Sequence, residues 1–353
     1  MGLDVKEKNL IKFLFKFLIP SISAIYLLRK YFFVDNFLGM FGFLALLKIA
    51  FNAILRPSYN KLTRNPKPVK SYGKWAIVTG ATSGIGENFA HHLAGEGMNL
   101  LLISRTASKL EQVCLDCEAI ASKGKNGAIK TKFLAYDYGT SDREVSRKFY
   151  EDLKTTLKSC DDGNIGMLIN NVGLSNENPL LTHMIPEEEI EQMLRVNNDG
   201  TLKMSRAVIP FMMERKSGAV ITVSSASCTH PTPMLSVYSA TKGFGNQLTR
   251  SMAIEYKEFG IDCLSITPYY FVSNMFKRNK ATYMAPFPQA LIDEALPLLG
   301  HEIEAYPYWG HWLMGQIALN YYDTGNGLLQ IMKRNKARAD ASAARKAAAA
   351  KKD

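Results

Sequence analysis

The sequence has little cysteine, little histidine and no excess of positive charge in its middle part, and each shortage excludes a class of protein. Five cysteines in 353 residues are too few for a disulfide framework, and the six histidines open no metal-binding motif. Cys114 and Cys117 form a C-x-x-C, a spacing also found in zinc and redox sites. No second ligand pair follows, and the motif lies in a helical pattern, Lys109–Lys123. We interpret both as ordinary thiols of a reducing compartment and expect no catalytic metal.

The positive charge is confined to the two ends of the chain. The net charge is +11, yet residues 1–70 hold 12 Lys/Arg against 3 Asp/Glu, and residues 327–353 hold 8 against 2. The middle, residues 71–326, therefore has a net charge of −4. A nucleic-acid-binding domain would carry its basic residues on the folded part, so this distribution favours a membrane surface and predicts no nucleic-acid partner. With 47% hydrophobic residues, the chain is too apolar to be disordered.

Residues 1–55 are apolar and predict a membrane anchor. Phe37–Leu55 is interrupted only by Lys48 and Asn52 and is near the lower length limit for a spanning helix. A cleaved signal peptide is the alternative, but it would have one apolar core and a cleavage site, which two long apolar runs fit poorly. Residues 56–71 are rich in proline and basic residues and predict a linker that keeps the rest of the chain in the cytosol.

From Lys74 onward, strand and helix patterns alternate. Short apolar runs predict six strands: Trp75–Thr79, Asn99–Ser104, Thr131–Tyr136, Gly166–Asn170, Ala219–Ser224 and Ile261–Thr267. Helical stretches lie between them, including Glu187–Arg215 and Ser236–Phe259. This alternation predicts an α/β fold, a Rossmann-type doubly wound parallel sheet, over residues 72–275.

The remainder of the chain loses that rhythm. Residues 276–332 contain an aromatic cluster, Tyr306–Trp312, beside the apolar run Leu313–Leu319, which is too short to span a bilayer. This composition predicts a substrate-binding extension that docks at the membrane, with ordinary packing against the sheet as the alternative for any single residue. Residues 333–353 are rich in alanine, lysine and arginine and predict a solvated or loosely helical basic tail.

A glycine-rich motif follows the first predicted strand and precedes a helix. Its residues are Gly80, Ser83, Gly84, Ile85 and Gly86. Glycines let the backbone turn tightly and approach a pyrophosphate, whose charge the helix N-terminus meets. The motif therefore predicts a dinucleotide site.

Arg105 follows the second predicted strand, where dinucleotide enzymes read the ribose 2′ position. An acidic residue there accepts a hydrogen bond from a free hydroxyl, whereas an arginine accommodates a 2′-phosphate. Ile103-Ser104-Arg105 contains no acid. NADPH is therefore the favoured cofactor, the alternative being that Arg105 is only a surface residue.

Tyr238, Lys242 and Ser225 form the most specific constellation. Tyr238 and Lys242 are four residues apart and would be neighbours on one helix face, and Ser225 precedes Tyr238 by thirteen residues. A free tyrosine has a pKa of about 10, and a nearby ammonium favours the phenolate and lowers that pKa. We therefore expect Lys242 to make Tyr238 a proton donor that works near neutral pH.

These motifs together resemble the short-chain dehydrogenase/reductase superfamily over Tyr72–Met275. Further matches are Asp137, Asn170-Asn171-Val172-Gly173, Asn197 and Pro268. The resemblance implies that Ser225 binds the substrate carbonyl, Tyr238 donates the proton, Lys242 binds the nicotinamide ribose and Asn197 carries a proton-relay water. It also implies that Asp137 holds the adenine amino group, that Asn171 lines the cofactor site and that Ser273 contacts the nicotinamide. Tyr269 stands where the family has glycine, and Ser273 where it has threonine.

Features outside this core are similar to the very-long-chain 3-oxoacyl-CoA reductase branch, which includes membrane-bound 17β-hydroxysteroid dehydrogenases. They are the apolar N-terminus, Tyr72–Trp75, Leu102–Arg105, and His311–Gly315 with a basic tail. The resemblance implies reduction of a long-chain 3-oxoacyl-CoA in fatty-acid elongation at the endoplasmic reticulum membrane, with the catalytic domain facing the cytosol. Implied partners are membrane lipid, other elongation enzymes and a second copy in a homodimer.

Two alternatives stay open at this point. A steroid or another lipid ketone could be reduced by the same machinery, because pocket shape is not encoded in the motifs. A catalytically silent membrane scaffold is the other alternative, although such proteins usually lose the tyrosine or the lysine, and both are present here.

The assignment of Arg105 is testable by substitution. In Arg105→Asp the new carboxylate would repel a 2′-phosphate, so we expect NADPH affinity to fall about tenfold or more while NADH affinity changes far less. Fluorescence titration with both cofactors measures this. An equal loss for the two would show that Arg105 does not meet the 2′-phosphate.

Overall fold

A computed structural model describes residues 44, 47, 65–272, 280–321 and 325–349. Residues 66–353 form one compact unit, separate from residues 1–65. The predicted anchor, including Phe37–Leu55, lies outside the described residues except for Leu44 and Leu47. Among the helices that the structure does describe, none combines the length and apolar character needed to cross a membrane.

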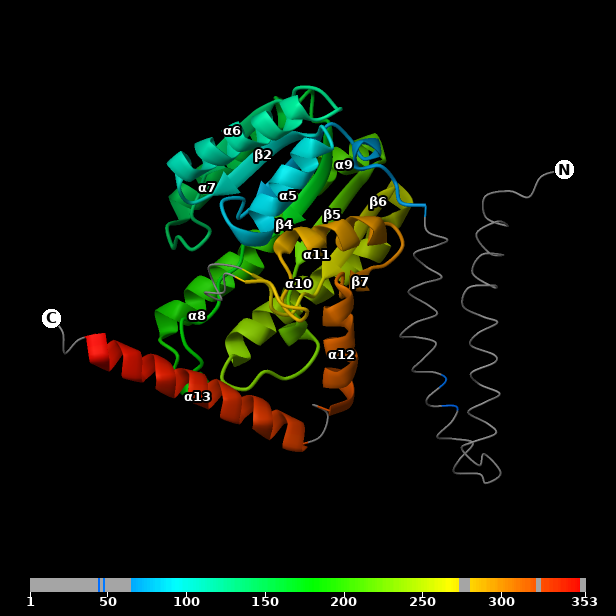
Figure 1. Ribbon diagram of the computed structural model, residues 1–353. Helices are drawn as coiled ribbons and strands as arrows, with labels where there is room; N and C mark the ends of the chain where they lie inside the picture. Colours follow the sequence, from blue (N-terminus) through cyan, green and yellow to red (C-terminus); the bar gives the residue numbers. More distant parts are fainter. Residues whose placement is uncertain (1–43, 45–46, 48–64, 273–279, 322–324, 350–353) are drawn as a thin grey trace. The chain divides into compact units, whose positions relative to one another are not determined.

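A seven-stranded parallel sheet forms the centre of the unit (Figure 1). The strand order is β3-β2-β1-β4-β5-β6-β7. The strands are β1 (Trp75–Thr79), β2 (Asn99–Ser104), β3 (Thr131–Ala135), β4 (Ile165–Asn170), β5 (Gly218–Val223), β6 (Ile261–Ile266) and β7 (Glu304–Ala305). The order reverses between β1 and β4, which is the switch point where such sheets bind ligands. The predicted doubly wound fold is confirmed.

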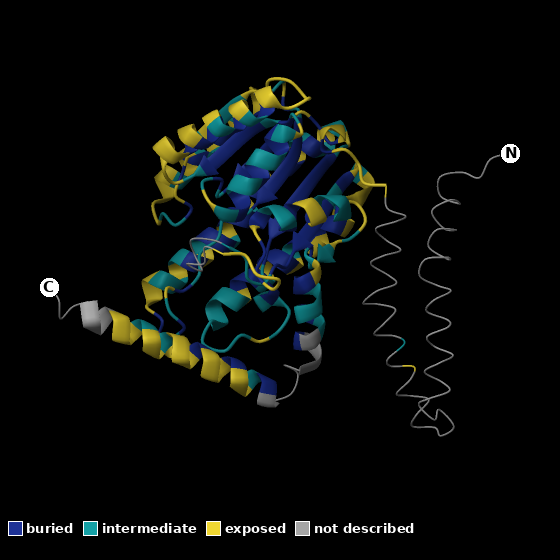
Figure 2. Cartoon of the chain, in the orientation of Figure 1, coloured by how far each residue is buried: buried dark blue, intermediate teal, exposed yellow. Residues whose placement is uncertain are grey.

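Helices cover both faces of the sheet. They are α5 (Gly84–Gly95), α6 (Ala107–Lys123), α7 (Arg143–Lys158), α8 (Glu187–Met193), α9 (Gly200–Arg215), α10 (Ser236–Glu255), α11 (Pro288–Ala295), α12 (Trp309–Tyr321) and α13 (Gly325–Ala349). One hydrophobic cluster joins the sheet to α5, α6 and α11, and a second joins it to α7, α9 and α10. Figure 2 shows the strands as the buried layer between them.

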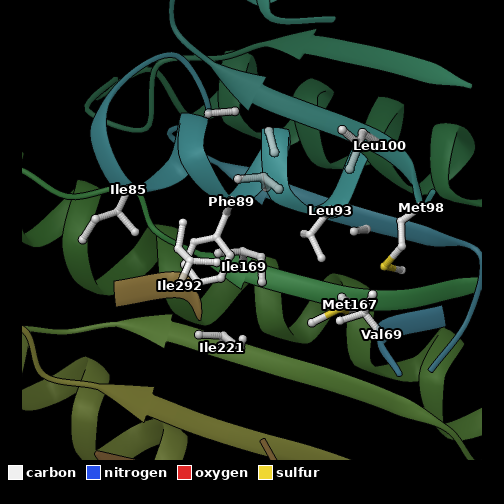
Figure 3. Close-up of a cluster of buried hydrophobic side chains, with 14 of the residues drawn as sticks. Val69, Ile85, Phe89, Leu93, Met98, Leu100, Met167, Ile169, Ile221 and Ile292 are labelled. Carbon is white, nitrogen blue, oxygen red and sulfur yellow. The ribbon is translucent and has the colours of Figure 1, made fainter. Parts of the chain in front are cut away.

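The two clusters follow from the alternation of side chains along each strand. In β1, Ala76 and Val78 belong to the first cluster, whereas Trp75 and Ile77 belong to the second. The central strands are buried at every position because both of their faces are covered. In the close-up of Figure 3, Phe89 of α5 lies among side chains of the sheet and of α11.

The structure adds three details to the predicted elements. The predicted helical stretch Glu187–Arg215 is helical throughout, and the π-helical turn Leu194–Asp199 lies between α8 and α9. A seventh strand, β7, pairs with β6 through two backbone bonds that Ser265 and Thr267 donate. The predicted tail, residues 333–353, begins within α13, in which Ile331 and Asn335 are buried while most described positions after Met332 are exposed.

The cysteine pair lies in α6, as the helical pattern predicted, and both thiols are free and buried. Burial raises the pKa of both, that of Cys117 to about 12. Such thiols stay protonated and are poor ligands and nucleophiles.

Close packing between α5 and the sheet edge predicts a requirement for glycine at position 86. A Cβ at Gly86 would collide with the carbonyl oxygen of Gly80 and the amide of Asn171, whereas one at Gly95 in the same helix would make only an ordinary contact with Ile120. We expect Gly86→Ala to lower the free energy of unfolding by about 1–3 kcal/mol. Gly95→Ala is the control and should equal or slightly exceed the wild type. Urea unfolding measures both, and equal stabilities would contradict the packing argument.

Candidate active site

One cleft lies at the carboxyl ends of the strands and brings most of the predicted site residues together. Its lining includes Gly80, Ser83, Gly84, Ile85, Arg105, Asp137, Asn171, Ser225, Tyr238 and Lys242. Gly86 and Asn197 do not line the cleft, but each packs against or binds residues that do. Ser273 lies outside the described residues.

The glycine turn after β1 is fastened to the end of β4. The Asn171 side-chain amide donates to the carbonyl oxygens of Thr79 at 3.0 Å and Gly80 at 3.1 Å. In return, the Thr79 hydroxyl oxygen accepts from the backbone N–H groups of Asn171 and Val172. Asn171 thus shapes the cofactor site mainly by holding the turn in place.

Gly80 and Gly84 have φ angles of +64° and +60°, a region that favours glycine. A Cβ at Gly80 would lie 2.9 Å from the Asn171 amide nitrogen. The turn therefore leaves a concave backbone surface at the N-terminus of α5, where the helix dipole and unpaired N–H groups attract anions. Such a cradle fits the pyrophosphate of a dinucleotide.

The cleft continues past the ends of β2 and β3. Arg105 is exposed there and, within the described part of the chain, forms no ion pair. The hydroxyl groups of Thr82 and Ser104 lie 2.9 Å apart beside it. Asp137 accepts a hydrogen bond from the backbone N–H of Gly139 at 2.9 Å, which orients its carboxylate. The arrangement fits an adenosine with its ribose near Arg105.

The three central residues of the prediction converge at the end of β5. Ser225 follows this strand, and its hydroxyl oxygen accepts from the backbone N–H and the hydroxyl of Ser227, at 3.2 and 3.0 Å. Burial raises the pKa of Tyr238, and a hydrogen bond with Ser225 opposes that rise. Tyr238 therefore holds its proton at neutral pH and can donate it to a substrate oxygen.

Lys242 is 9% exposed, and its ammonium donates to the carbonyl of Val223 at 2.9 Å. Burial lowers the pKa of Lys242 to about 8. Burial is the largest cause acting on the pKa of Tyr238 and raises it, so the expected lowering of that pKa by Lys242 stays a prediction. The ammonium is directed to the end of β5, beside Gly173.

Asn197 lies in the π-helical turn, and its side chain is fully engaged. Its amide nitrogen donates to the carbonyl of Leu174 at 2.9 Å and to the hydroxyl of Thr241 at 2.8 Å, and its amide oxygen accepts from the N–H of Leu174 at 2.7 Å. It therefore joins the segment after β4 to α10, next to Lys242. A relay water at Asn197 stays a prediction.

The sequence motifs did not predict that the segment after β6 lines the cleft. Tyr269 and Phe271, which follow β6, line the cleft. His311 of α12 is fully buried behind them, accepting from the N–H of Tyr269 at 3.3 Å and lying 2.8 Å from the carbonyl of Tyr270. Burial lowers the pKa of His311 to about 4, so the imidazole is neutral and bridges two backbone groups. Two sequence signals fall on this region, the replacement of the family glycine by Tyr269 and the similarity of His311–Gly315 to the reductase branch.

Comparisons with known proteins give a consistent result. The family model described as short chain dehydrogenase matches residues 74–284. A very-long-chain 3-oxoacyl-CoA reductase-like protein of Arabidopsis thaliana is 34% identical over 299 residues, covering 82% of this chain and 91% of the relative. The very-long-chain 3-oxoacyl-CoA reductase of Pyricularia oryzae is 38% identical over 247 residues, 69% of this chain and 71% of the relative.

Among solved structures, a 7β-hydroxysteroid dehydrogenase superposes with a TM-score of 0.64 at 21% identity, covering 75% of this chain and 99% of that chain. At this identity the likeness concerns the fold alone.

The buried ammonium of Lys242 predicts a measurable link between pH and stability. A lysine in the unfolded chain has a pKa of about 10.4. Between pH 8 and this pKa, the unfolded chain therefore holds a proton that the folded chain has released. Below pH 8 the buried charge lowers the free energy of unfolding by about 3 kcal/mol. Between pH 8 and the pKa of the unfolded chain this cost disappears, so stability rises with pH in that window.

We expect the free energy of unfolding of Lys242→Met to exceed that of the wild type most at neutral pH. This difference should shrink by about 3 kcal/mol as the pH is raised toward 10. Urea unfolding of both proteins across this range measures the difference. Lys154→Met, on the exposed face of α7, controls for the loss of one lysine. A difference that does not change with pH would show that Lys242 is not a strained buried cation.

Proposed function

Because the chain belongs to the short chain dehydrogenase family, we propose that it reduces very-long-chain 3-oxoacyl-CoA to 3-hydroxyacyl-CoA with NADPH. The observation that carries this proposal is the convergence of Ser225, Tyr238 and Lys242 with the glycine cradle in a single cleft. The names of the relatives from Arabidopsis thaliana and Pyricularia oryzae support the acyl-CoA substrate.

When bound, NADPH supplies the hydride that adds to the 3-oxo carbon. The residues of the chain supply the proton and the orientation. Ser225 donates a hydrogen bond to the carbonyl oxygen, which polarises the carbonyl and fixes its distance from Tyr238. Tyr238 then transfers its proton to the same oxygen, completing the alcohol.

The pKa values on either side of this transfer fit the reaction. Burial raises the pKa of Tyr238, so the donor is protonated before the transfer. Afterwards its phenolate needs stabilisation, which the hydrogen bond with Ser225 and the cationic Lys242 provide from one side of the cleft. Lys242 thus acts after proton release more than before it.

NADPH rather than NADH is part of the proposal, and it is supported by Arg105. A cation that forms no ion pair with any described residue, at the ribose end of the cleft, is suited to a 2′-phosphate, which guanidinium groups bind with two parallel hydrogen bonds. The end of β2 and the residue after it, Ile103-Ser104-Arg105, contain no acidic residue that could accept from a free 2′-hydroxyl.

We also propose that the enzyme works at the endoplasmic reticulum membrane with its catalytic unit facing the cytosol. The apolar run Phe37–Leu55 and the basic residues that follow it support this placement. A very-long-chain acyl-CoA is amphiphilic and partitions into bilayers, so an attached enzyme would meet it there. Membrane lipid, other elongation enzymes and a homodimeric partner belong to the same proposal.

Removal of the Tyr238 hydroxyl tests the reaction. In Tyr238→Phe we expect turnover of a long-chain 3-oxoacyl-CoA to fall by about 10²–10⁴-fold, because the proton donor is lost while the ring keeps its packing. NADPH affinity should stay within about twofold. The measurement is NADPH oxidation by detergent-solubilised protein, together with cofactor fluorescence.

Tyr256→Phe, at the far end of α10, is the control and should keep wild-type turnover. If Tyr238→Phe retained most of its activity, the proton donor would be another group. A wild type that binds NADPH but reduces no 3-oxoacyl-CoA would point to another lipid ketone or to a scaffold.

A further inference from the structure

The C-terminal helix α13 is anchored beside the catalytic cleft. Its inner stripe includes Ile331 and Asn335, which are 3% and 1% exposed. The amide of Asn335 donates to the carbonyl of Pro233 at 2.8 Å, in the segment between Ser225 and Tyr238. The outward side of the helix is exposed over most of its length (Figure 2). The position of α13 along this segment is therefore fixed.

Arg334 is turned toward the wall of the cleft. Its guanidinium donates to the hydroxyl of Tyr270 at 3.3 Å and lies 6.0 Å from the centre of that ring. Tyr270 is adjacent to Tyr269 and close enough to Tyr238 to contribute to its raised pKa. One tyrosine thus separates the guanidinium from the proton donor.

Arg338 follows one turn later on the same flank of α13. Within the described part of the chain neither arginine forms an ion pair. Residues 71–326 have a net charge of −4, so α13 places positive charge beside an otherwise acidic unit. Lys336 lies on the opposite flank of the buried stripe.

We propose that Arg334 and Arg338 bind phosphate groups of coenzyme A, the diphosphate or the 3′-phosphate of the substrate. This inference rests on the proposed 3-oxoacyl-CoA reductase function. In this proposal the 3-oxo group lies at Ser225 and Tyr238, and the pantetheine arm extends toward α13. Guanidinium groups suit phosphate because their paired donors match two phosphate oxygens.

Anionic lipid headgroups present the same chemistry, but the geometry favours the substrate. A surface for lipid would use the outermost side of α13, where Lys333 and neighbouring residues are exposed. Arg334 instead points inward to Tyr270, at the boundary between the helix and the cleft wall. The subsite would also give acyl-CoA an advantage over a steroid, which carries no phosphate.

The test compares two substrates of the full-length protein in nonionic detergent, a 3-oxoacyl-CoA and the matching 3-oxoacyl-pantetheine, which lacks phosphate. We expect the wild type to prefer the CoA thioester in kcat/KM. Arg334→Gln should lose about tenfold in kcat/KM with the CoA thioester but stay within about twofold with the pantetheine thioester. Adding Arg338→Gln should deepen the loss, and Arg334→Lys should restore part of it.

Lys336→Gln is the matched control, since it removes the same charge from the opposite flank of α13. It should leave both substrates unchanged. A loss equal to that of Arg334→Gln would indicate diffuse attraction and overturn the subsite. So would equal losses on both thioesters, which would mean that Arg334 acts only by holding Tyr270.

Two further outcomes separate this inference from others. A charge effect seen only after addition of phosphatidylserine vesicles would assign α13 to lipid and overturn the coenzyme A subsite. If the wild type reduces both thioesters equally well, the subsite is wrong while the reductase function stands. If it reduces neither, the proposed function fails and the subsite with it.

Discussion

The hydrogen bonds that join the end of β1 to the end of β4 are the constraint on which the cleft depends. These two strands lie at the switch point of the sheet, where the chain leaves in opposite directions and would otherwise open a gap. Asn171 and Thr79 close it by satisfying four backbone groups. Because the glycine turn is fixed from this side, α5 begins at a defined place and presents its positive end to the cleft.

Burial of charge is the second organising feature. Lys242 donates to the end of β5 at a cost in folding free energy, and the network around Asn197 holds α10 and the segment after β4 close to it. A protein selected for stability alone would place an apolar residue there. In the proposed reaction, the retained ammonium stabilises the phenolate formed when Tyr238 gives up its proton, so that the cost in stability would serve catalysis.

The sequence was sufficient to predict the elements whose signal is local. Six strands were predicted to within one residue at each end, since apolar runs bounded by glycine or charge identify buried parallel strands. The π-helical turn was not predictable, because its extra residue is stabilised by contacts of Asn197 with Leu174, 23 positions away. β7 has only two residues and no periodicity, and α13 has a polar composition typical of a solvated tail. Its buried face depends on Asn335 meeting Pro233, a contact that no local pattern encodes.

The bridge made by His311 has a consequence for the order in which the protein becomes competent during its synthesis. Strands β1 to β6 and their helices precede α12 in the chain, so the nucleotide half of the cleft can form while the C-terminal region is still being made. The wall at Tyr269 and Tyr270 acquires its support only when His311 arrives. A chain ending before His311 would therefore keep its dinucleotide cradle but lack a firm boundary on the substrate side. Vectorial synthesis thus separates the two halves of the site in time, with cofactor recognition first.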